Sequence, residues 1–243
     1  MRYEIQFLFI VKKGLIMRMW FIPKLLSAVL IALSGSFSVP NQDQTVLAEI
    51  KENHHEITLN TSTQPVQGMY SGITVSWNNR TKSFPWENIS EPAFYPEVAT
   101  GNIDGKGQDE AIIILTTGKG SGTRASAVHV LKDDWTEIPV GDAVTKAKNA
   151  LYSMYKEHTA TVEYTLNIAG NEYAYSYPIE DAGMWFEQAV VGNILRYRVQ
   201  ENKLIAEMPV QVSPGTFTGS IEVEFREHNG TLVPAEVIYV ENL

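Results

Sequence analysis

From Gly68 onward, the chain consists of short segments in which apolar and polar residues alternate, separated by turn-forming residues. ITVSW at residues 73–77 is one such segment; the residues NNR follow it, and TKSFPW returns the chain. Alternation with a period of two places apolar side chains on one face of a strand, and turns rich in Asn and Gly join antiparallel neighbours. The pattern therefore predicts a mainly β fold built from antiparallel hairpins.

The segment AIIILTT at residues 111–117 lacks this alternation, because its first five residues are all apolar. A strand of this kind is typically covered on both faces. The loop GKGSG leads from it into SAVHVL, which predicts a second hairpin. After residue 157, strand-like segments recur at regular spacing, with turns at AGNE, ENK and EHNG. This spacing is typical of a small sandwich or barrel.

One segment has helical rather than strand-like spacing. Its apolar residues recur every three or four positions, at Val144, Ala147, Leu151 and Tyr155. Asp142 precedes them as a suitable N-cap, so a helix is expected from Asp142 to Tyr155. We expect it to join two small β units, residues 68–156, which include the helix, and residues 157–243. Each unit is small for an independent core, so the two are expected to pack together.

Residues 1–38 have the features of a secretory signal peptide. Lys24 precedes the short apolar run LLSAVLIAL, and the small residues SGSFS follow it. A membrane-spanning helix needs about 20 apolar residues, so no stable membrane span is expected after cleavage, which we place before Val39. The residues before Met17 are unusual for a signal peptide, which suggests that translation starts at Met17 or Met19. Residues 39–67 are mostly polar and predict a flexible tether, in which EITLN at residues 56–60 could form a strand.

The charge balance indicates a protein that does not bind nucleic acid. The chain has 19 basic and 28 acidic residues; residues 1–38 hold five of the basic residues and one acid, which leaves a net charge of −13 on the remainder. Nucleic acids and anionic membranes are bound by clusters of Lys and Arg. The chain contains no Cys, which excludes disulfides and thiolate metal sites. Secretion without disulfides is more typical of a bacterium than of an animal.

The densest polar stretch is GNIDGKGQDE, residues 101–110, directly before the apolar strand. Calcium is bound by several oxygens around a tight turn, and Asn102, Asp104 and Glu110 supply side-chain oxygens with glycines between them. The loop is not an EF-hand, because Ile113 stands where that motif requires a glutamate. The stretch is therefore a candidate calcium site, although a glycine turn whose acids face solvent is the preferred interpretation.

The order N-x-D-G-x-G-x-x-E before an apolar strand resembles the loop of FG-GAP/VCBS-type β-propeller repeats, usually D-x-D-G-D-G-x-x-D/E. The resemblance implies a propeller-blade-like sheet in the first β unit, with Gly105 and Gly107 as turn glycines. It also implies calcium at four positions: Asn102, Asp104, Lys106 and Glu110. Lys106 departs from the family pattern, because it removes an oxygen and places an ammonium beside the ion. We find no second copy of the loop, so a complete propeller is not expected. The wider order of segments is also similar to secreted proteins of Gram-positive bacteria.

These observations predict a secreted bacterial protein that binds or supports an extracellular structure, with a cell-wall polymer or an extracellular protein as partner. The alternative is a secreted hydrolase that cleaves carbohydrate or peptide, for which Glu180 and Asp181 are the first acids to consider. Four aromatic residues are candidates for a sugar-binding platform, although packing at the core is the preferred interpretation: Trp77, Trp86, Tyr95 and Trp135. The sequence assigns no catalytic residue and does not decide whether the protein is an enzyme.

Overall fold

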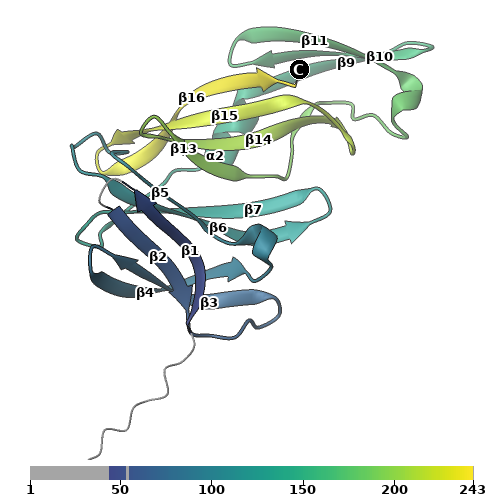
Figure 1. Cartoon of the computed structure of the whole chain (residues 1–243). Helices are drawn as coiled ribbons and strands as arrows, with labels where there is room; N and C mark the ends of the chain where they lie inside the picture. Colours follow the sequence, from purple (N-terminus) through teal and green to yellow (C-terminus); the bar gives the residue numbers. More distant parts are fainter. Residues whose placement is uncertain (1–43, 53–54, 243) are drawn as a thin grey trace, which may run out of the picture. The chain divides into compact units, whose positions relative to one another are not determined.

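The computed structural model describes residues 44–242 apart from residues 53 and 54 (Figure 1). By its internal contacts, Asp43–Leu243 forms one compact unit. The described part is mainly β, with antiparallel sheets and one α-helix, so the predicted fold class is confirmed. The signal peptide, its cleavage before Val39 and the start at Met17 or Met19 fall outside the described residues and stay predictions.

The described residues of this unit form four antiparallel sheets. The N-terminal sheet contains β1 (Thr45–Glu52), β2 (His55–Thr61), β3 (Met69–Trp77) and β4 (Arg80–Ile89). The central sheet contains β5 (Glu97–Gly101), β6 (Glu110–Gly120), β7 (Thr123–Leu131) and β8 (Glu137–Ile138). The three-stranded sheet contains β9 (Leu151–Glu157), β10 (Thr161–Ile168) and β11 (Asn171–Pro178). The C-terminal sheet contains β12 (Val190–Val191), β13 (Arg196–Gln200), β14 (Lys203–Ser213), β15 (Thr216–His228) and β16 (Thr231–Glu241).

The N-terminal sheet corrects the expectation of a flexible tether at residues 39–67. Within it, residues 45–52 and 55–61 form β1 and β2, which pair with each other, and β2 also pairs with β3. Leu47, Ile57 and Leu59 are buried. A strand that is buried on one face needs only a few apolar residues, so the polar residues on its other face dominated the composition of the segment.

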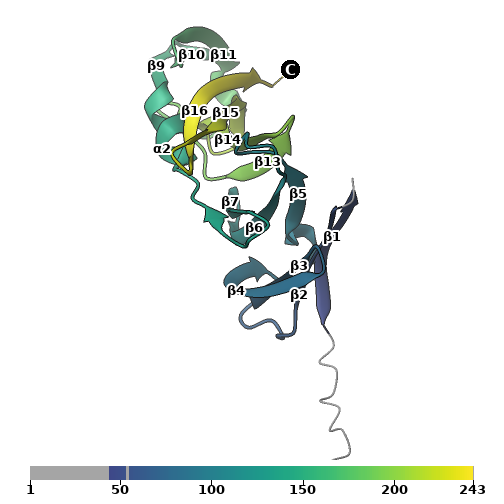
Figure 2. The same cartoon turned by 90° about the vertical axis from the view of Figure 1, so that its left-hand side faces the viewer.

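The central sheet lies between the N-terminal and the C-terminal sheets (Figures 1 and 2). Each of its faces contributes side chains to a separate hydrophobic core. Ala111, Ile113 and Leu115 of β6 lie in the core shared with the N-terminal sheet. Ile112 and Ile114 point to the other side and lie in the larger core. The continuous apolar run of β6 therefore reflects burial on both faces, which confirms the prediction made for this strand.

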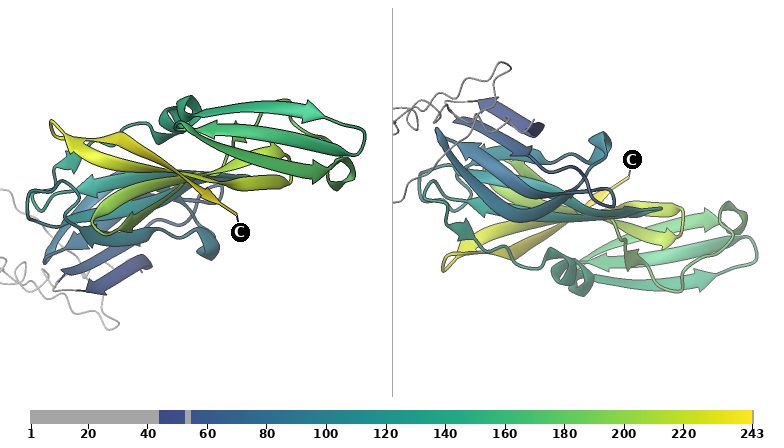
Figure 3. Two further views of the ribbon diagram at one scale, coloured as in Figure 1. Left: turned by 90° about the horizontal axis from the view of Figure 1, so that it is seen from above. Right: turned by 90° about the horizontal axis from the view of Figure 1, so that it is seen from below.

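The larger core contains residues from both predicted β units. Ile112 belongs to residues 68–156 and Leu204 to residues 157–243, and both are fully buried in it. The boundary predicted after residue 156 falls inside strand β9. Figure 3 shows the three-stranded sheet beside β14 and β15, with α2 (Ala143–Ala150) at one end. The register shifts where β15 pairs with β14 and with β16, which interrupts the regular ladder.

Helix α2 begins as predicted but ends earlier. Asp142 Oδ1 accepts a hydrogen bond from Thr145 N at 3.1 Å, which caps the helix. The prediction extended the helix to Tyr155, whereas Leu151 already begins strand β9. Leu151 and Tyr155 are four residues apart, so they share one side of a strand as well as of a helix, and both pack against the larger core. No helix in the part of the chain described here is long and apolar enough to cross a membrane.

Tight turns connect the hairpins. Asn78–Asn79, Glu201–Asn202 and Asn229–Gly230 each place two successive residues at positive φ. Positive φ at both central residues is the conformation of a type I′ turn, which fits the twist of antiparallel strands. The turns predicted at NNR, ENK and EHNG are therefore confirmed.

Candidate functional site

The acidic loop, residues 102–110, connects β5 to β6 in the central sheet (Figure 1). Gly105 and Gly107 have φ angles of 70° and 90°, a conformation that favours glycine. Their predicted role as turn residues is confirmed. The turn allows Asn102, Asp104 and Glu110 to accept hydrogen bonds from backbone N–H groups of the loop itself.

Asp104 is enclosed by nitrogen donors, and its side chain is 2 % exposed. Its Oδ1 accepts a hydrogen bond from Lys106 N at 2.8 Å, and its Oδ2 accepts one from Lys132 Nζ at 2.9 Å. The Nζ atom of Lys106 lies 3.8 Å from the same Oδ2 atom. Both oxygens of this carboxylate are therefore occupied, and two ammonium groups neutralise its charge.

Glu110 and Asn102 hold the two ends of the loop together. Glu110 Oε2 accepts hydrogen bonds from Ile103 N at 2.8 Å and from Asp104 N at 3.2 Å. Asn102 Oδ1 accepts one from Gly107 N at 3.1 Å. These contacts satisfy backbone donors that a tight loop would otherwise leave without partners.

Burial and hydrogen bonding shift the pKa values of this cluster in different directions. Burial alone would raise the pKa of Asp104, but hydrogen bonds from Lys132 and from the Lys106 N–H outweigh it, so this pKa lies below its ordinary value. For Glu110 burial dominates, and its pKa is raised. The hydrogen bond to Asp104 raises the pKa of Lys132. Asp104 and Lys132 therefore form a charged pair at neutral pH.

The four residues predicted to hold calcium lie in one loop, but their contacts do not fit the ion. Calcium needs several oxygen ligands that point at one centre, whereas Asp104, Glu110 and Asn102 already accept N–H groups. Lys106 Nζ instead lies 3.0 Å from Glu227 Oε1. Residues 44–52 and 55–242 contain no group of three or more His, Asp or Glu side chains placed to hold a metal. Calcium binding stays a prediction, and the lysine contacts provide a way to test it.

A pocket of about 330 Å³ lies beside the acidic loop. Its lining residues come from the loop and from two neighbouring turns: Trp77, Asn78, Gly107, Gln108, Asp109 and Asp133. The acids considered for a hydrolase, Glu180 and Asp181, lie elsewhere, in the exposed 3₁₀ turn Ile179–Asp181. The structure therefore does not bring Glu180 and Asp181 into this pocket.

The aromatic residues considered for sugar binding pack in or against the smaller core, as the preferred interpretation expected. Trp77 is 1 % exposed. Trp86 stacks on His129, with ring centroids 3.9 Å apart. Tyr95 and Trp135 are half-buried against the same core.

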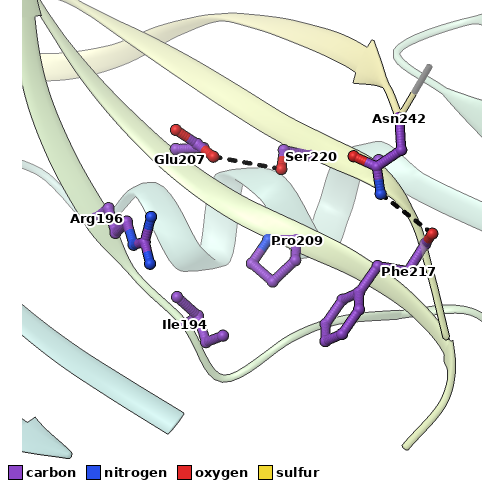
Figure 4. A pocket seen from close by; sticks show the side chains of 8 residues that line it. Ile194, Arg196, Glu207, Pro209, Phe217, Ser220 and Asn242 are labelled. Atoms are coloured by element: carbon purple, nitrogen blue, oxygen red, sulfur yellow. Dashed lines mark hydrogen bonds between the residues drawn. The ribbon is translucent and has the colours of Figure 1, made fainter. Parts of the chain in front are cut away.

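A second pocket, which no local sequence pattern indicates, lies on the C-terminal sheet (Figure 4). Its volume is about 270 Å³. Eight residues line this Arg196 pocket: Ile194, Arg196, Glu207, Pro209, Phe217, Gly219, Ser220 and Asn242. They come from β13 and the segment before it, from β14 and β15, and from the residue after β16. Strand pairing, rather than a local motif, brings them together.

The Arg196 pocket combines polar and apolar walls. Pro209 and Phe217 supply the apolar side (Figure 4). Glu207 Oε1 accepts a hydrogen bond from Ser220 Oγ at 3.4 Å, and Asn242 Nδ2 donates one to Phe217 O at 3.2 Å. The polar side chains are thus held by neighbours within the pocket.

Two neighbouring cations of the C-terminal sheet have ion-pair partners, whereas Arg196 has none in the described part of the chain. Arg198 pairs with Glu222 at 2.8 Å, and Lys203 pairs with Glu224 at 2.6 Å. The Arg196 guanidinium makes no hydrogen bond or ion pair with any other residue that the structure describes. It is therefore an exposed cation in a pocket that also contains the carboxylate of Glu207, its cross-strand neighbour.

Comparisons with models of known protein families, with curated proteins and with solved structures found no significant match for this chain.

Proposed function

We propose that the protein is an extracellular, cell-wall-associated binding protein and that the Arg196 pocket holds a peptide that ends in a free carboxylate. The observation that carries this proposal is the unpaired Arg196 guanidinium beside the apolar surface of Pro209 and Phe217 (Figure 4). The signal-peptide features of residues 1–38 support an extracellular location.

The chemistry of the pocket favours a single carboxylate. A guanidinium presents a planar fork of N–H donors that matches the two oxygens of a carboxylate. The net charge of −13 after residue 38 disfavours a polyanion, because such a ligand would be repelled by the rest of the surface. A volume of about 270 Å³ suits a short peptide end with a small apolar side chain, which Pro209 and Phe217 would contact.

The proposal is tested with a short peptide in two forms. N-acetyl-alanyl-alanine with a free carboxylate and its carboxamide are titrated into the isotope-labelled protein, residues 39–243, at low salt. The free acid is expected to shift the amide signals of Arg196, Ser220 and Asn242, and the carboxamide is not. Arg196→Gln should weaken binding by roughly tenfold, because a charge-assisted hydrogen bond is lost.

The matched control is Arg226→Gln, which removes an exposed arginine outside the pocket and should leave binding unchanged. Equal shifts of the amide signals with the free acid and the carboxamide would contradict the proposal. An equal loss of binding in Arg196→Gln and Arg226→Gln would also contradict it. Cleavage of the peptide during the titration would instead support the alternative, a hydrolase. Stem peptides of cell walls and carboxyl ends of proteins share this chemistry, and titration with each type distinguishes the two sources.

A further inference from the structure

The acidic loop needs a positive charge, because Asp104 and Glu110 bring two carboxyl groups into a buried loop. A buried carboxylate is costly unless a cation or several donors compensate it. The FG-GAP/VCBS-type loops that its sequence resembles often hold calcium through their acids. Here the nearest positive charge to Asp104 is the ammonium of Lys132, 2.9 Å from Oδ2.

Lys132 is held in place from a different part of the chain. It follows β7, and its backbone N–H donates to Thr136 O at 2.9 Å, while its carbonyl accepts from Trp135 N at 2.9 Å. These bonds fix the backbone of the turn between β7 and β8. The side chain of Lys132 is only 34 % exposed, so its ammonium approaches Asp104 from a preorganised position.

Lys106 and Asn102 extend the same network to the C-terminal sheet. Lys106 Nζ lies 3.0 Å from Glu227 Oε1, near the turn between β15 and β16. Asn102 N donates to Asn202 Oδ1 at 3.2 Å, in the turn between β13 and β14. The acidic loop therefore connects the central sheet to two hairpin turns of the C-terminal sheet.

We propose that the ammonium of Lys132 occupies the cation position of the acidic loop, so that this loop joins the central and C-terminal sheets without a metal ion. Lys106 supports this arrangement, because it stands where the family pattern has an acid and contacts both Asp104 and Glu227. The ammonium of Lys132 supplies the positive charge that calcium would supply. The turn can therefore contain a lysine at the position where the family pattern has an acidic ligand.

The first test is thermal unfolding of residues 39–243 with millimolar calcium and with chelator. The wild-type midpoint should be the same in both, because a ligand that does not bind the folded state does not stabilise it. Lys132→Met keeps the length of the side chain and removes its charge. It is expected to lower the midpoint by roughly 4–8 °C in both conditions. The control Lys156→Met removes an exposed lysine of β9 and should leave the midpoint unchanged.

A double variant tests the position of the cation directly. Lys106→Asp combined with Lys132→Met restores the acid of the family pattern and removes the ammonium, so calcium should now raise the unfolding midpoint. A wild-type midpoint that rises with calcium would overturn the proposal, as would an unchanged midpoint for Lys132→Met. A double variant that unfolds cooperatively but ignores calcium would overturn the assignment of this position to a cation. None of these outcomes depends on the Arg196 pocket.

Discussion

At the scale of single residues, buried polar groups link parts of the chain that lie far apart in sequence. Tyr164 is 1 % exposed, and its hydroxyl lies 2.5 Å from Phe186 O and 3.1 Å from Val212 O. It therefore connects the three-stranded sheet to the C-terminal sheet. Burial raises its pKa from 10.0 to about 12, with smaller contributions from Tyr155 and Tyr177.

Tyr164→Phe should lower the free energy of unfolding by about 1–2 kcal/mol, because a buried hydrogen bond is lost. The raised pKa also makes wild-type stability fall at high pH: the unfolded tyrosine ionises from about pH 10, whereas the folded one stays neutral until about pH 12. The difference in the free energy of unfolding between wild type and Tyr164→Phe should therefore become smaller above pH 10. Urea unfolding at pH 7 and pH 11 measures both effects.

The control for this prediction is Tyr152→Phe, which removes the hydroxyl of an exposed tyrosine. It should leave the free energy of unfolding unchanged at both pH 7 and pH 11. Equal stabilities of Tyr164→Phe and Tyr152→Phe at pH 7 would show that the Tyr164 hydroxyl makes no net contribution.

At the scale of elements, the local pattern predicted strands and turns well where it had only one interpretation. The run in β6 required burial on both faces, and the two cores supply it. The pattern failed at residues 151–155, where a spacing of four fits a helix and a strand equally. It also missed the strand at residues 45–52 and allowed the one at residues 55–61 only as an exception within a tether, because a half-buried strand can be largely polar. In both places, pairing with a neighbouring strand decided the outcome.

The N-cap of α2 provides a prediction for this element. Asp142→Ala should lower the free energy of unfolding by about 1 kcal/mol, because the first turn loses the carboxylate that accepts from Thr145 N. The hydrogen bond from the Thr145 hydroxyl lowers the pKa of Asp142, so this contribution is present above the ordinary carboxyl pKa and is lost as the pH falls through the folded value.

Urea unfolding of wild type and variant at pH 7 and pH 3 measures this cap. Asp181→Ala, at the end of an exposed 3₁₀ turn, is the matched control and should behave as wild type. If Asp142→Ala lowers the free energy of unfolding equally at both pH values, the charge of the carboxylate does not act as the cap.

At the scale of the whole molecule, the central sheet requires cover on both faces. Leu47, Ile57 and Leu59 of the first two strands belong to the core on one face. The segment that contains them is therefore part of the folded unit rather than a spacer before it.

Removing residues 39–63 should strongly destabilise the protein, because each buried aliphatic side chain contributes roughly 1.5–3 kcal/mol. A chain that begins at residue 64 is expected to unfold at a markedly lower temperature than residues 39–243, or to be insoluble. Calorimetry and circular dichroism of both chains check this. Coincident midpoints would restore the view of this segment as a tether.

The two candidate sites differ in how much of each could be predicted. The glycine turn of the acidic loop is local, so Gly105 and Gly107 could be assigned from sequence. Lys132 could not be assigned, because it reaches Asp104 only when β7 and β6 pair. The Arg196 pocket could not be predicted at all, since its walls come from strands that are separated along the chain and meet only in the sheet.

The sequence by itself determined the mainly β fold, the hairpin turns, the two-sided burial of β6 and the N-cap of α2, because alternation, turn chemistry and capping act over a few residues. Only the tertiary structure decided which charges meet, that Lys132 neutralises Asp104 and that Arg196 is left without a partner. The physical reason is that charge pairing depends on distances of a few ångströms between side chains, and strand pairing sets those distances across long stretches of chain.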